Sequence, residues 1–160
     1  MSNHPSSAED HMEKILQINT GIVSLAIMRD GKDTGTLSFN PTDTLFAERF
    51  YALLGELQKS LNDYKARGIE LSKKGFDQDG VPVNVEEQIA MQIQLCNYLR
   101  EKIDKIFGEG TSQKLFGEVR NLEIYQQFFD GILPFFQQAR AEKVAKYTTE
   151  ASAKRNRRKK

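Results

Sequence analysis

The side chains that most often perform acid–base, nucleophilic or metal chemistry are few in this chain and poorly placed for it. His4 and His11 are the two histidines; they lie seven residues apart near the start of the chain, and no cysteine is close to either in the sequence. Cys96 is the single cysteine, which excludes an intramolecular disulfide and a zinc site built from cysteines. We therefore predict no metal site and no cofactor.

Two short motifs begin like ligand-binding loops but do not complete the pattern. Asp77 and Asp79 resemble the start of a calcium loop, yet Gln88 stands at the twelfth position, where such a loop needs glutamate. Gly108 and Gly110 supply only the first half of a dinucleotide-binding glycine pattern, and they follow a predicted helix instead of a strand. Without a nucleophile elbow or P-loop either, the chain is predicted to be a binding protein and not an enzyme.

Composition indicates one domain outside the membrane. The chain has 160 residues, of which 39% are hydrophobic, and this is enough for a single core. No apolar run approaches the ~20 residues that a membrane-spanning helix needs. Residues 1–13 are too polar for a secretory signal. We expect a cytoplasmic protein without a membrane partner.

Charge is distributed unevenly along the chain. Residues 154–160 hold six of the 23 basic residues and no acidic ones, leaving 17 basic and 22 acidic residues, a net charge of −5, elsewhere. We predict a mobile arm at residues 1–20, a single domain at 21–147 and a disordered basic tail at 148–160. We interpret the tail as a solvated terminus; the alternative is attraction to nucleic acid or to an acidic partner.

A β-hairpin is predicted at the start of the domain. Apolar and β-branched residues occupy 22–28 and 34–39, on either side of Asp30-Gly31. A two-stranded hairpin is marginal alone, so it must lie on the helices or pair with a strand of another subunit. Its edge is a candidate for self-association or peptide capture, with Ile22 and Leu37 as contact residues.

Two long amphipathic helices are predicted next. Asn40 is the expected cap of the first, which should end near Gly68. The second should begin at Asn84, with Glu87 completing a capping box. Its predicted buried face carries apolar residues at three- and four-residue spacing, namely Ile89, Ile93, Cys96, Leu99, Ile103 and Ile106.

The segment from Ile103 to Gly117 should fold these helices against the rest of the chain. Gly108 can end the second helix and Gly117 can end a short one that starts near Thr111, so Phe116 is predicted to be buried between the long helices. A third main helix should start at Asn121 and be kinked or broken at Pro134. The predicted class is therefore α+β and mainly α: an N-terminal hairpin, three main helices, the last kinked, and a disordered tail.

Two phenylalanine pairs flank Pro134 and lie seven residues apart, Phe128-Phe129 and Phe135-Phe136. Some of these four phenylalanine side chains should complete the core. The excess is expected to form a groove or subunit interface, with at least one residue of each pair exposed. All four are therefore candidate partner-binding residues.

Several stretches resemble the tail assembly chaperone-like proteins of prophages and siphophages of Gram-positive bacteria. They are TGIVSLAIMRDG, FNPTDTLFAERFYALL, IFGEGTSQKLFG and NLEIYQQFFDGI, together with the basic C-terminus, and IFGEGTSQKLFG is the most distinctive. The resemblance covers most of residues 21–147. The loop at 75–85 is longer than in smaller members, and Pro134 within the last helix also departs from the pattern.

The resemblance implies a function without catalytic residues. Such a protein coats the tape measure protein, keeps it soluble and helps to recruit tail tube subunits in the host cytoplasm, and it is absent from the mature virion. Self-association along the client fits this role. The alternatives are a structural tail component or a small nucleic-acid-binding adaptor that acts through its basic tail, although nucleic acid is not the expected partner.

Overall fold

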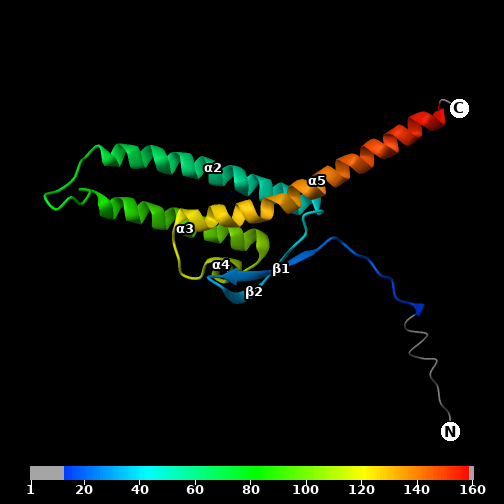
Figure 1. Cartoon of the computed structure of the whole chain (residues 1–160), viewed down its shortest axis with the longest axis horizontal. Helices are drawn as coiled ribbons and strands as arrows, with labels where there is room; N and C mark the ends of the chain where they lie inside the picture. The colour runs from blue at the N-terminus through cyan, green and yellow to red at the C-terminus, as the bar shows by residue number, and fades with distance from the viewer. Residues whose placement is uncertain (1–12, 159–160) are drawn as a thin grey trace, which may run out of the picture.

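A computed structural model describes residues 13–158 and places an antiparallel hairpin before a set of helices (Figure 1). This confirms the predicted α+β, mainly α class. Of the arm predicted at 1–20, residues 1–12 lie outside the described part. The elements are β1 Val23–Arg29, β2 Lys32–Phe39, α2 Thr44–Ser72, α3 Val85–Phe107, α4 Thr111–Phe116 and α5 Leu122–Arg158.

The hairpin turns at Asp30-Gly31, as predicted. Both residues have positive φ, 53° and 79°, which suits a tight turn between right-twisted strands. The hairpin lies on α4, which satisfies the first of its two predicted options. One guanidinium nitrogen of Arg29 donates to the carbonyls of Gln113 and Lys114 at 2.9 and 3.0 Å, and the Thr34 hydroxyl donates to Lys114 O at 2.6 Å.

Helix α2 begins three residues later than expected. Its cap is Asp43, whose carboxylate accepts from Leu45 N at 3.0 Å. The Asn40 side chain instead holds the preceding turn, since it accepts from Thr42 N at 3.0 Å and donates to Thr20 O at 2.7 Å. The helix also continues past Gly68 to Ser72, because one glycine within a helix costs only about 1 kcal/mol.

Asn84 precedes α3 as predicted, but the capping box is absent. Its side chain makes no cap hydrogen bond. The Asn84 amide donates instead to Leu71 O at 2.6 Å, and its oxygen accepts from Gln88 at 3.0 Å. This buried residue therefore ties the end of α2 to the start of α3, so that the two helices form an antiparallel hairpin.

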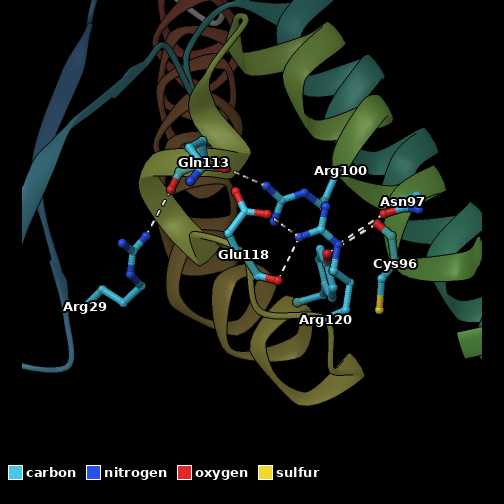
Figure 2. A network of polar contacts seen from close by, with 8 residues as sticks. Arg29, Cys96, Asn97, Arg100, Gln113, Glu118 and Arg120 are labelled. Carbon is cyan, nitrogen blue, oxygen red and sulfur yellow. Dashed lines mark hydrogen bonds and ion pairs between the residues drawn. The ribbon is translucent and has the colours of Figure 1, made fainter. Parts of the chain in front are cut away.

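The segment between α3 and α5 folds as predicted. Phe116 on α4 is 4% exposed, which confirms its burial. The α4 amide of Ser112 donates to the Asp104 carboxylate at 2.7 Å, and the Ser112 hydroxyl donates to Arg100 O at 2.9 Å. Figure 2 shows Gln113 of α4 between Arg29 of β1 and Arg100 of α3, so polar contacts fix α4 from both sides.

Helix α5 continues through Pro134 without a break. Pro134 removes the hydrogen bond to the carbonyl of Asp130, and both residues are exposed, so water can satisfy that carbonyl. The helix extends to Arg158, whereas disorder was predicted for residues 148–160. Alanine, glutamate, lysine and arginine in this segment all favour helix. No helix within the described residues is long and apolar enough to cross a membrane.

Tyr125 connects α5 to the middle of α3. Its hydroxyl donates to Cys96 O at 3.2 Å, and both side chains are fully buried. Burial raises the pKa of Tyr125 from 10.0 to about 12, and burial also raises the pKa of the Cys96 thiol. Cys96 therefore serves as the small buried hydrophobe predicted for that helix face.

The raised pKa of Tyr125 predicts a loss of stability at high pH. A tyrosine in the unfolded chain ionises near pH 10, whereas Tyr125 in the folded chain stays neutral up to about pH 12. Ionisation therefore favours the unfolded chain between these values: the stability linked to Tyr125 is fully present below pH 10 and is lost as the pH rises to about 12. The loss should reach about 2 to 3 kcal/mol. Tyr125→Phe should remove this slope when urea unfolding is measured below and above pH 10; parallel pH curves for the two proteins would contradict the assignment.

Candidate protein-interaction surface

The phenylalanines predicted to face a partner belong to the core. Phe128, Phe129 and Phe136 are 8%, 2% and 1% exposed, and Phe135 is half-buried. The expectation that each pair leaves one residue exposed is wrong for the first pair, and no ring of the second is freely exposed. Phe128, Phe129 and Phe136 therefore offer no surface to a partner, and Phe135 offers only part of its ring.

Aromatic residues of β2, α2 and α3 account for this burial. The Phe136 ring stacks on Phe50 with centroids 4.0 Å apart and planes 3° apart, and it also contacts Phe39 at 5.6 Å. Phe128 meets Phe107 edge-on at 5.4 Å. The four phenylalanines thus belong to an aromatic layer built by several elements. The other rings of this layer cover the apolar surface that was expected to remain exposed.

The two candidate residues of the β-hairpin are placed differently. Leu37 is buried within the core at 5% exposure, so it cannot contact a partner in the folded chain. Ile22 is 65% exposed and immediately precedes β1. Of this pair, only Ile22 remains a candidate contact.

The α2–α3 hairpin extends well beyond the start of α5. Arg120, two residues before α5, donates to the side chain of Asn97 at 3.1 Å, and Tyr125 in the first turns of α5 bonds to Cys96. Residues 85–95 of α3 and the adjacent end of α2 therefore lie past the N-terminus of α5. Figure 1 shows this end of the hairpin projecting away from α5, whose own C-terminal part extends in the opposite direction.

The apolar stripe of α3 continues onto this uncovered part. Cys96, Leu99 and Ile103 are fully buried, but Ile89 and Ile93 on the same stripe are 53% and 42% exposed. The periodicity therefore identified the correct helix face, whereas the predicted burial of its first two residues is wrong. No element in the described part of the chain covers them as α5 covers the others.

Helix α2 contributes the matching side of this surface. Leu53 and Leu57 are buried, and Leu61, one turn further on, is half-buried with Gly68 two turns beyond it on the same stripe. We call the surface formed by Leu61, Ile89 and Ile93 the distal apolar face. Further exposed apolar residues surround the tip of the hairpin, namely Ile69, Phe76, Val81 and Val83.

The distal apolar face consists of apolar side chains bordered by a few charged ones. Among the described residues, no group of three or more His, Cys, Asp or Glu side chains is placed to hold a metal ion. Lys65 of α2 and Glu86 of α3 are exposed and bear opposite charges. Lys65 follows Leu61 by four residues and Glu86 precedes Ile89 by three, so helix spacing places both beside the distal apolar face. An amphipathic helix with an apolar stripe and mixed charges at its edges would match this arrangement.

Comparison with known proteins gives a family but no activity. No curated protein and no solved structure matches the chain. A family model described as a family of unknown function (DUF6673) matches residues 33–160, which include all of β2 except its first residue and helices α2 to α5. The chain therefore belongs to the DUF6673 family.

Proposed function

We propose that this protein is a phage tail assembly chaperone that binds the tape measure protein, keeps it soluble in the host cytoplasm and helps to recruit tail tube subunits. Two observations support the proposal. Segments such as IFGEGTSQKLFG resemble tail assembly chaperone-like proteins. The observation that carries it is the distal apolar face, where Ile89 and Ile93 are about half exposed on a stripe that is otherwise core.

The covered part of the stripe indicates what the uncovered part can bind. Helix α5 packs on the proximal α2–α3 face through an apolar side that includes Tyr125 and Phe129. A client helix in line with α5 would continue that packing. Residues 85–95 span about 16 Å at 1.5 Å per residue, so the site accommodates about three turns of an amphipathic helix.

A surface of this size suits a chaperone that must release its client. A tape measure protein is a long helical chain whose apolar stripes have no partner before the tube forms, so many copies would each cover a short stretch. Three partly exposed residues provide a weak single contact, and copies bound along one client would gain avidity of about 10² or more. Tube subunits can then displace the copies one at a time.

The proposal predicts that replacing Ile89 and Ile93 together with serine reduces the amount of soluble client on co-expression. The client to test is a tape measure protein, the proposed partner. Serine and isoleucine have similar helix propensities, and both sites are partly exposed, so the variant should fold. Circular dichroism would verify the fold, and the soluble fraction of the client would be measured after centrifugation.

Three controls identify the surface that acts. Val144→Ser changes an apolar residue of matched exposure, 55%, on the projecting part of α5 and should leave client solubility unchanged. Ile22→Ser tests the strand edge, and deletion of residues 154–160 tests the basic tail. If the Ile89 and Ile93 variant keeps the client soluble while either of the last two does not, the distal apolar face is not the client site.

A further inference from the structure

A groove runs between α2 and α3 on a face of the hairpin different from the distal apolar face. Met91 follows Ile89 by two residues, which turns it about 200° around α3. The groove widens into three cavities along its length, of about 440 Å³ near Arg49 and Lys105, 290 Å³ near Ser60 and Leu95, and 430 Å³ near Glu70 and Glu87.

The charges along this groove change sign from one end to the other. The cavity near the domain is lined by Arg49, Lys102 and Lys105 with one acidic residue, Glu56, for a net charge of +2. At the tip of the hairpin, two acidic residues face Arg67, for a net charge of −1. The middle cavity has one acidic and one basic residue.

The charged groups at both ends are free to bind a partner. In the described part of the chain, the one ion pair within 4.0 Å joins Arg120 to Glu118, outside the groove. Arg49, Lys105, Glu70 and Glu87 are exposed and take part in no side-chain hydrogen bond among those found for residues 13–149. Within the described part of one chain, these four side chains therefore form no ion pair and can pair with charges on a partner.

We propose that this groove is a homodimer interface in which two copies pack antiparallel about a two-fold axis. The axis would cross the groove at its middle cavity, so the basic end of each copy would face the acidic tip of the other. Helix α2 would then pack against α2 of the second copy and α3 against α3, giving a four-helix bundle. A parallel arrangement would place like charges together instead.

Sequence spacing shows that one axis satisfies both helices. On α2, the midpoint between Arg49 and Glu70 falls beside Ser60. On α3, the midpoint between Lys105 and Glu87 is residue 96, next to Leu95. Ser60 and Leu95 line the same middle cavity, so the two midpoints lie at the same level along the hairpin.

A direct contact between α2 and α3 also shows which residues of the two helices lie opposite each other. The Tyr98 hydroxyl donates to Glu56 at 3.2 Å, which places residues whose numbers sum to 154 side by side. Residues 60 and 95 sum to 155, and Leu71 and Asn84, which are hydrogen-bonded at 2.6 Å, give the same sum. The antiparallel register of α2 and α3 therefore aligns both charge pairs on one two-fold axis.

The size of the face permits a second copy as the occupant, and its composition favours one. From Arg49 to Glu70 the face is about 32 Å long, and two helices side by side are about 20 Å wide, so roughly 600 Å² is available against the roughly 800 Å² per partner of a standard interface. The floor includes Ala52, Met91 and Leu95, which can pack between helices. The face also matches its own charge pattern on reversal, which an unrelated partner has no reason to do.

The test uses two charge-reversal variants of the full chain and measures mass by sedimentation equilibrium over a range of concentrations. The first carries Arg49→Glu and Lys105→Glu, and the second carries Glu70→Lys and Glu87→Lys. Each variant turns four opposite-charge contacts of the dimer into like-charge contacts. Each should therefore raise the dimer dissociation constant at least about tenfold relative to the wild type. Circular dichroism verifies that each variant is folded.

The decisive comparison restores opposite charges across the proposed interface. An equimolar mixture of the two variants should dimerise, because the acidic end of one then faces the basic end of the other at both sites. The chain with all four substitutions should dimerise alone for the same reason. A wild type that stays monomeric, a mass above the dimer, a variant that dimerises like the wild type, or a mixture that remains monomeric would each overturn the proposal. The proposal does not depend on the chaperone function.

Discussion

Replacing Phe136 with alanine is expected to lower the free energy of unfolding by about 3 to 5 kcal/mol, because it removes a fully buried ring and leaves a cavity. Phe136 is 1% exposed and lies against three other phenylalanines. The ring centroids are 4.0 Å from Phe50, 5.6 Å from Phe39 and 5.9 Å from Phe46, so the ring joins α5 to both β2 and α2.

Urea unfolding followed by circular dichroism would measure this loss. Phe135→Ala is the matched control, since the adjacent residue has the same side chain but is only half-buried and should cost clearly less. Equal losses at the two positions would mean that Phe136 is not at the centre of the core. Polar substitution of Phe136 is for the same reason unsuitable as a test of client binding.

Phe116→Ala is expected to destabilise the protein by about 3 kcal/mol or more. The ring is 4% exposed and lies 4.6 Å from the Tyr125 ring and 5.9 Å from the Phe128 ring. It is the main apolar anchor of the six-residue helix α4, on which the β-hairpin rests through Arg29 and Thr34. Its loss should therefore also weaken the attachment of the hairpin.

Thermal unfolding and amide hydrogen exchange would separate these two effects. The midpoint should fall, and the amides of β1 and β2 should lose protection by a larger factor than those in the middle of α2. Val119→Ala, at a 48% exposed position after α4, is the control and should change neither quantity appreciably. An unchanged midpoint for Phe116→Ala would contradict the role of this segment as the junction of the fold.

Local signals predicted the elements well where the deciding contacts were also local. Asp30-Gly31 fixed the turn of the β-hairpin through its positive φ angles. The cap of α2 was misplaced because Asn40 and Asp43 both suit that role, and the choice depends on a bond from Asn40 to Thr20, twenty residues away. The position of Asn84 before α3 was predicted correctly, but its capping box was wrong for the same reason, since its partner Leu71 lies on another helix.

The sequence predicted only part of the candidate site. Spacing identified Ile89 and Ile93 as members of the apolar face of α3, but periodicity does not show how far a covering helix extends. That depends on where α5 begins against α3, which the contacts from Arg120 and Tyr125 determine. The phenylalanine pairs were assigned to a surface because a single sequence does not show how many aromatic partners they meet.

The most direct test of the central claim, that the distal apolar face receives the client, is hydrogen exchange of the protein alone and in complex with a tape measure protein, the proposed client. Binding should slow exchange in residues 61–72 of α2 and 85–95 of α3, with little change in β1 and in residues 140–149 of α5. Protection confined to β1 or to the C-terminal part of α5, with residues 85–95 unchanged, would contradict the account.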